Sequence, residues 1–302
     1  MRRVLTVHFA PCALFVAGVL ALVRAGSFSG RSDWGAVWPQ RPASVFGAIT
    51  TITVCATFLS LLLQPFQVRA VRVLEGYWDR WSPTARLAGV LVQVQRKRWL
   101  ALRKRAHRKV GRDRELRVRA DALRRLAAVP PADVLLPTAL GNALRAGELS
   151  AGERYGLTTL TSWPRIYLQV SDRMAEVLRS TRDALDTAVN FCWAFLVLTG
   201  TGVTALYDEP SAWWLCGVGS VLAAVAYKGA VTAAQAYSGL MHVVYDLHRF
   251  DLLDALHYPL PTDPASEEAL FSEVSDRFAG LRSRGRPYDH GPSDGGDEST
   301  ER

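Results

Sequence analysis

The sequence lacks the short motifs that mark most catalytic and metal sites. It contains no HExxH zinc motif, no nucleophile elbow, no phosphate-binding loop and no pair of carboxylates in a plausible catalytic setting. Its four cysteines form no CxxC or Cys/His spacing; one falls in each of four apolar runs, where cysteine behaves as a small hydrophobe: Cys12, Cys55, Cys192 and Cys216. We therefore expect no metal, no cofactor, no disulfide framework and no enzyme.

Formal charge is almost missing from four long stretches of the chain. They predict membrane spans at about residues 4–23, 43–64, 187–207 and 212–233, because roughly 20 apolar residues at 1.5 Å rise match a bilayer core of about 30 Å. The spans hold no acidic residue, and His8 is the strongly polar residue of the first. With 49% apolar residues in runs of this length, the sequence indicates an all-α integral membrane protein with four spans in two hairpins.

The first apolar run leaves two interpretations open. Val23-Arg24-Ala25 before Gly26 has small residues where a signal peptidase cuts, so residues 1–25 could be a cleaved signal peptide. We favour an uncleaved span, because the apolar core exceeds the usual signal length of roughly 7–15 residues and a second run follows closely. Cleavage would leave three spans.

A polar block separates the two predicted hairpins. Residues 66–186 carry 24 basic and 12 acidic side chains, and residues 96–125 alone carry 14 basic against three acidic ones, a local charge of +11 compared with +8 for the chain. Basic loops are retained on the cytoplasmic side. We therefore expect residues 66–186 to form a helical cytoplasmic domain, with both termini cytoplasmic and the protein in the cell membrane.

The basic run has a narrow apolar stripe that predicts helices. Trp99, Leu102, Ala106 and Val110 recur at helical spacing, as do Leu116, Ala120, Leu123 and Ala127, which is typical of a helical hairpin. The charged remainder is either a solvated face or a binding surface for anionic lipid headgroups or an acidic protein; nucleic acid is the weakest partner, because no stacking aromatics accompany the charge. The candidate binding residues are Arg96, Lys97, Arg98, Arg103, Lys104, Arg105, Arg108, Lys109 and Arg112.

The most distinctive stretch begins at Pro137. It reads P-T-x-x-G-N-x-L-R-A, and R-Y-G-L and W-P-R follow at residues 154–157 and 163–165. This pattern resembles a family of bacterial multi-pass membrane proteins of uncharacterised function over about residues 115–260, which implies a helical membrane protein and no activity. Thr138 is placed to cap a helix, and Gly141 and Gly156 permit close backbone approach or positive φ. Arg145, Arg154, Trp163 and Arg165 form either a structural cluster of stacked and paired arginines or an anion-binding or partner-binding pocket.

Polar residues near the fourth span are candidate functional groups. Lys228 can extend to the membrane interface or line a polar path. His242 and Asp246, four residues apart on one helix, could bind a metal or transfer protons, but such a pair is more often structural. The fourth helix is expected to continue past the membrane.

The complete prediction has five segments. A first hairpin (1–65), the basic domain (66–186) and a second hairpin (187–240) precede a cytoplasmic helical extension (241–282) and a disordered acidic tail (283–302). A non-enzymatic scaffold, adapter or regulator is the favoured function. An oligomeric channel or transporter is the alternative, supported by Lys228 and by small residues that would suit a homo-oligomer.

Overall fold

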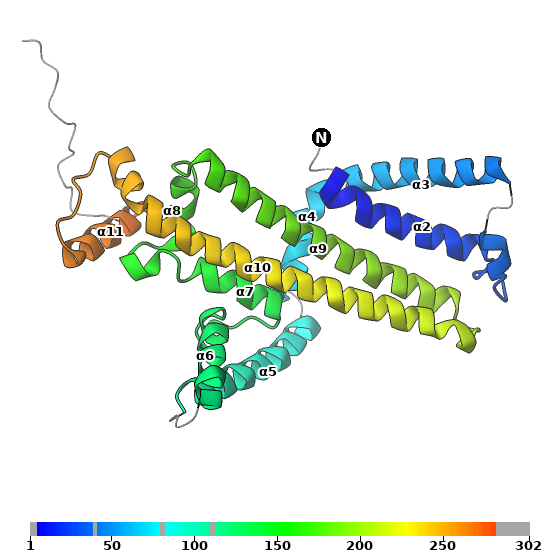
Figure 1. The fold of residues 1–302 in the computed structure, drawn as a ribbon, viewed down its shortest axis with the longest axis horizontal. Helices are drawn as coiled ribbons and strands as arrows, with labels where there is room; N and C mark the ends of the chain where they lie inside the picture. Colours follow the sequence, from blue (N-terminus) through cyan, green and yellow to red (C-terminus); the bar gives the residue numbers. More distant parts are fainter. Residues whose placement is uncertain (1–4, 39–40, 79–81, 109–112, 282–302) are drawn as a thin grey trace, which may run out of the picture. The chain divides into compact units, whose positions relative to one another are not determined.

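The computed structural model describes residues 5–38, 41–78, 82–108 and 113–281, and every regular element in these ranges is a helix (Figure 1). Four helical segments are long and apolar enough to cross a membrane: Val7–Arg24, Pro42–Glu75, Asp172–Ala205 and Pro210–Ala255. Each predicted span falls on one of them. The prediction of an all-helical chain with four candidate spans is therefore confirmed for the described residues, whereas the acidic tail at 283–302 lies outside them.

The chain divides into two compact units. The first comprises Met1–Ala146 and Val177–Tyr237, and the second comprises Gly147–Glu176 and Ser238–Arg302. Three helices contribute residues to both units: α7 (Ala139–Glu148), α9 (Asp172–Ala205) and α10 (Trp213–Ala255). Helix α9 begins at Asp172, well before the third predicted span, and runs through that span without a break. The length of α10 confirms that the fourth helix continues well beyond an apolar core of about 20 residues.

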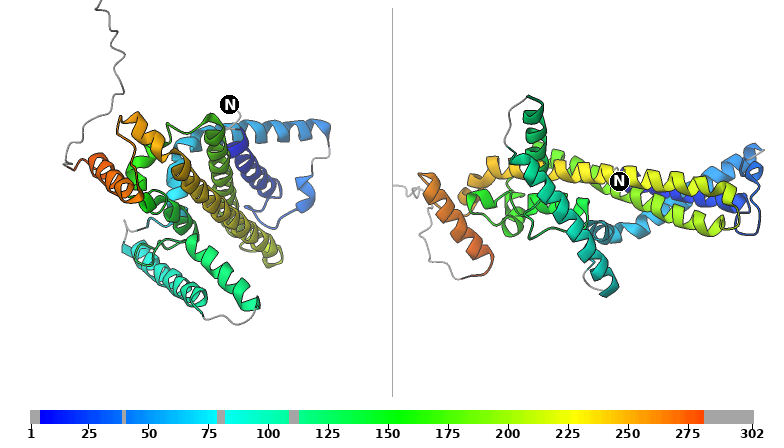
Figure 2. Two further views of the ribbon diagram at one scale, coloured as in Figure 1. Left: turned by 60° about the vertical axis from the view of Figure 1, so that its left-hand side comes forward. Right: turned by 90° about the horizontal axis from the view of Figure 1, so that it is seen from below.

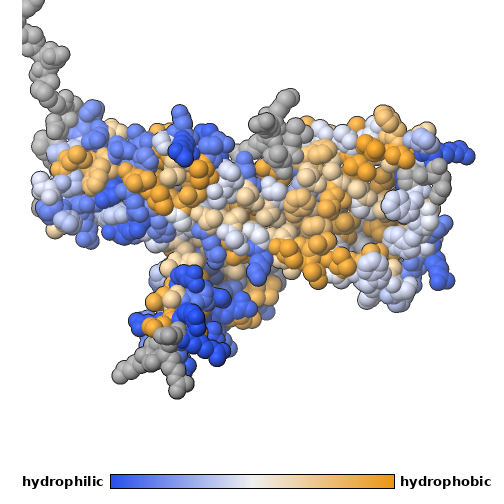
Figure 3. Space-filling view, in the orientation of Figure 1, coloured by the Kyte–Doolittle hydropathy of each residue, from blue (hydrophilic) through white to orange (hydrophobic). Residues whose placement is uncertain are grey.

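The first unit begins with two packed apolar helices. A π-helical turn (Leu5–Phe9) leads into α2 (Ala10–Arg24), which packs against α3 (Pro42–Leu63). A 3-10 turn at Gln64–Phe66 joins α3 to α4 (Gln67–Glu75), since Pro65 lacks the N–H that would continue the helical ladder. The outer surface of α3 is apolar, with Phe46, Phe58 and Val54 more than 60% exposed, as lipid-facing side chains would be. Figure 3 shows hydrophobic surface on this part of the protein.

One hydrophobic core of the first unit includes residues of the P-T-x-x-G-N-x-L-R-A stretch. Helix α7 (Ala139–Glu148) buries Leu140 and Leu144 against α4, α9 and α10. Its first turn is fixed by Thr138, whose Oγ1 accepts a hydrogen bond from the Gly141 N–H at 3.0 Å and donates one to the Glu75 carbonyl at 2.7 Å. A Cβ on Gly141 would lie 2.1 Å from that same carbonyl oxygen. The predicted cap and the predicted close approach at Gly141 are both confirmed.

The second unit packs two short helices around the distal part of α10. Helices α8 (Thr159–Ile166) and α11 (Pro264–Phe278) contact each other, and the buried side chains include Ile166, Tyr245 and Phe271. Gly156 ends the preceding 3-10 turn at φ +83°, and a Cβ there would lie 2.6 Å from the Glu268 carbonyl oxygen. The positive φ predicted for this glycine is thus confirmed.

Candidate functional site

The basic run forms a helical hairpin in the first unit. Helix α5 (Ser82–Ala106) and helix α6 (Asp113–Ala127) pack against each other, as Figures 1 and 2 show. Helix α5 begins well before the basic run and includes a valine-rich stretch, residues 90–94, that resembles a strand. Good helix formers and an unbroken apolar stripe decide this outcome over the local β-propensity.

Helix α5 has one covered face and one exposed face. Ala88 and Ala106 are almost fully buried, and Trp99 and Leu102 between them are half-buried. Gln95 on this side donates a long hydrogen bond to the Pro137 carbonyl at 3.4 Å. The predicted stripe on α5 therefore does face protein.

The opposite row of α5 changes character along its length. Leu87, Val90 and Val94 are 53%, 63% and 39% exposed. At the same three- and four-residue spacing the row then continues with exposed Arg98, Ala101 and Arg105, and exposed Arg108 follows just past the end of the helix. One face of the helix thus presents an apolar half followed by a basic half, which the sequence pattern alone did not separate.

The candidate binding residues on this hairpin point into solvent. Seven of the nine are exposed, and in the described part of the chain none of the seven forms an ion pair with a carboxylate: Arg96, Lys97, Arg98, Arg103, Lys104, Arg105 and Arg108. Arg103 also lies over the Trp99 ring, with its guanidinium carbon 5.3 Å from the ring centre. Lys109 and Arg112 lie outside the described residues. The like charges of these side chains repel one another, so a negatively charged partner would relieve that repulsion.

The stripe predicted for α6 faces outward. Leu116 and Leu123 are 53% and 46% exposed, whereas Ala122 is buried and Leu126 half-buried. The hairpin therefore packs through a row one position away from the predicted one. Small Ala122 permits closer contact with α5 than leucine would, and the two leucines are left beside exposed arginines.

The residues of the arginine cluster predicted around 145–165 differ in their surroundings. Arg145 belongs to the first unit, and its Nε is buried without a hydrogen-bond partner among the described residues. Arg154 pairs with Asp246 at 2.7 Å, and Arg165 lies over the Phe278 ring at 3.9 Å. Trp163 stacks on Tyr245 with ring centres 6.2 Å apart. Stacking and pairing of this kind support the structural interpretation for Arg154, Trp163 and Arg165.

The two members of the predicted His242–Asp246 pair bind different groups. The His242 ring shares hydrogen bonds with the Ser150 hydroxyl (3.0 Å) and the Ser238 carbonyl (2.8 Å). Asp246 accepts a 2.5 Å hydrogen bond from the Tyr155 hydroxyl in addition to its ion pair with Arg154. Burial, and then this bond to Asp246, raise the pKa of Tyr155 above its usual value. Across the described residues no group of three or more His, Cys, Asp and Glu side chains is placed to hold a metal.

Lys228 lies exposed on α10 as the sixteenth residue of the helix. This position suits a long side chain that extends along the helix to reach a polar interface.

Protein-family models, curated proteins and solved structures give no match to this chain. Its function must therefore be argued from its own residues.

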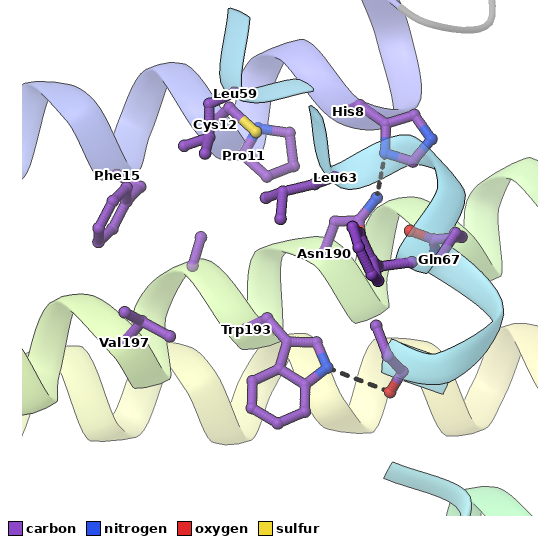
Figure 4. Close-up of a pocket in the computed structure, with 13 residues that line it drawn as sticks. His8, Pro11, Cys12, Phe15, Leu59, Leu63, Gln67, Asn190, Trp193 and Val197 are labelled. Carbon is purple, nitrogen blue, oxygen red and sulfur yellow. Dashed lines mark hydrogen bonds between the residues drawn. The ribbon is translucent and has the colours of Figure 1, made fainter. Parts of the chain in front are cut away.

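The structure contains a second candidate site, which the sequence did not predict. A cavity of about 390 Å³ lies between α2, α3, α4 and α9 in the first unit, and Figure 4 shows the side chains around it. Polar groups gather at one end: Asn190 of α9 donates to the Val7 carbonyl (3.0 Å) and shares a 3.2 Å hydrogen bond with His8. The available signal was the presence of His8 and Asn190 in two otherwise apolar predicted spans.

Proposed function

We propose that this protein is a non-enzymatic membrane scaffold, adapter or regulator whose α5–α6 hairpin binds anionic lipid headgroups. Four apolar helices would anchor it in the cell membrane, with both termini and the hairpin on the cytoplasmic side. Charge supports this orientation, since residues 66–186 carry a net +12 and the loop before α10 carries Asp208 and Glu209.

The observation that carries the proposal is the exposed row of α5. Its apolar half, Leu87 to Val94, suits the boundary between headgroups and acyl chains, and its basic half, Arg98 to Arg108, suits the lipid phosphates. An acidic protein would satisfy the arginines but would leave three exposed apolar side chains uncovered beside them. Lipid therefore accounts for both halves with a single partner.

Spin labelling of the full chain in nanodiscs tests the proposal. A label at Val90→Cys, with the four native cysteines replaced by alanine, reports depth through its collisions with oxygen and with a water-soluble nickel chelate. In nanodiscs that contain anionic lipid, we expect the label to be accessible to oxygen and shielded from nickel. Each basic residue near such a surface contributes roughly 1 kcal/mol, so the double substitution Arg98→Gln/Arg105→Gln should lower the docked-to-free ratio about 30-fold at moderate salt.

A matched double substitution provides the control. Arg31→Gln/Arg173→Gln removes the same charge from exposed positions outside the hairpin and should leave the label docked. A label equally exposed to nickel in neutral and anionic nanodiscs would refute lipid docking. Loss of docking in the control would show that total charge, rather than the α5 face, attracts the hairpin.

A further inference from the structure

The cavity in the first unit opens on the side of the molecule that carries exposed apolar residues. Leu63 and Phe66, which line it, are 44% and 47% exposed, and they belong to the end of α3 and the turn that follows. Phe15 and Val197 extend the apolar wall along α2 and α9 (Figure 4). Its volume of about 390 Å³ falls within the range of roughly 300–1,000 Å³ typical of ligand pockets.

The polar end of the cavity holds one unused hydrogen-bond donor. Among the described residues the Gln67 Nε2 atom is buried and has no hydrogen-bond partner. The neighbouring donors are engaged, because Asn190 bonds to Val7 and His8, and the Trp193 Nε1–H donates to the Ala70 carbonyl at 3.2 Å. A buried amide donor without a partner is unfavourable, so this geometry favours a ligand with a hydrogen-bond acceptor at that point.

A cation lies beside the same end. The Arg69 guanidinium carbon is 5.8 Å from the centre of the Phe66 ring, and Phe66 lines the cavity. Arg69 is exposed on α4, one turn before exposed Arg72. The site therefore combines an apolar wall, a buried amide donor and a nearby positive charge.

We propose that this cavity binds an anionic phospholipid from the surrounding membrane. One acyl chain occupies the apolar part, the Gln67 amide donates to the ester carbonyl of that chain, and the Arg69 guanidinium contacts the headgroup phosphate. The three features match the three chemical groups of a phospholipid: an acyl chain, an ester carbonyl and a phosphate. The inference rests on the membrane location in the proposed function and not on the hairpin.

Native mass spectrometry of the full chain in mild detergent tests this assignment. After delipidation, phosphatidylglycerol or phosphatidylcholine is added at equal concentration, and the fraction of protein retaining one lipid is measured. We expect stronger retention of phosphatidylglycerol. Ala194→Trp should reduce that retention at least tenfold, because Ala194 lines the cavity and indole would fill it. The matched control Ala224→Trp places the same bulk at an exposed position of α10 and should retain lipid like the wild type.

Two smaller changes keep the assignment testable if Ala194→Trp fails to fold. Gln67→Leu should weaken retention of both lipids, and Arg69→Gln should abolish the preference for phosphatidylglycerol. Equal retention by the wild type and all three cavity variants would overturn the proposal, as would a co-purified apolar molecule that neither phospholipid displaces. Arg98→Gln/Arg105→Gln should leave this retention unchanged, so failure of the hairpin proposal can be told from failure of this one.

Discussion

Replacement of Asn142 by alanine should destabilise the first unit by several kcal/mol. The side chain is 2% exposed and holds both backbone groups of Leu136: its Oδ1 accepts from the Leu136 N–H at 2.7 Å, and its Nδ2 donates to the Leu136 carbonyl at 3.0 Å. Leu136 is itself only 8% exposed. Two buried backbone groups would lose their partners at roughly 1–3 kcal/mol each, which gives about 2–6 kcal/mol in total.

Thermal unfolding in mild detergent, followed by far-ultraviolet circular dichroism, measures this loss. A folding unit of 150–250 residues, a range that includes the first unit, loses roughly 2–4 °C in Tm per kcal/mol. Tm should therefore fall by about 4 °C or more. Gln93→Ala removes another amide side chain, from an exposed position of α5, and should leave Tm near the wild-type value. If Asn142→Ala unfolds at the temperature of Gln93→Ala, the two hydrogen bonds do not stabilise the loop before α7 and the reasoning is wrong.

Two further predictions concern the second unit. Gly156→Ala should destabilise it by more than Gly280→Ala, measured by hydrogen exchange of α8 and α11. Both glycines have positive φ, which costs alanine about 1–2 kcal/mol. A Cβ at 156 would also meet the Glu268 carbonyl, whereas no atom of the described residues lies within 4 Å of a Cβ at 280. Equal exchange in the two variants would exclude that contact. Asp263 caps α11 by accepting from the Ser266 and Ala265 N–H groups, and these bonds, that of Ser266 first, hold its pKa below the usual value. Its contribution is therefore present above about pH 4 and lost as pH falls. The protection of α11, measured relative to the intrinsic exchange rate at each pH, should therefore fall under acid in the wild type and show little further acid-induced change in Asp263→Ala.

Several features of the fold could be read from local sequence because a local cause dominates them. Helix α10 runs through the predicted fourth span without a break because no proline falls between Trp213 and Ala255. Thr138 caps α7 because a hydroxyl at that position is within reach of the N–H three residues later. The α6 stripe was wrong by one position because alanine and leucine rows alternate around that helix, and only contact with α5 selects between them.

Site residues divide in the same way. Exposure of Arg98 and Arg105 follows from their charge, which the sequence states directly. The partners of His242 and Asp246 could not be found from their spacing, because Ser150, Arg154 and Tyr155 approach them from a loop about 90 residues away. The same holds for Gln67, whose unpartnered amide gains meaning only beside Phe66, Arg69 and a cavity walled by other helices.

By itself the sequence determined the class of this protein: four apolar helices of membrane length and a strongly basic block between two pairs of them. These properties depend on composition and periodicity, which local chemistry fixes. Only the tertiary structure decided which row of α5 stays exposed and where a cavity opens between α2, α3, α4 and α9. Packing between helices distant in the chain makes that choice, because it determines which side chains are covered and which donors are left without a partner.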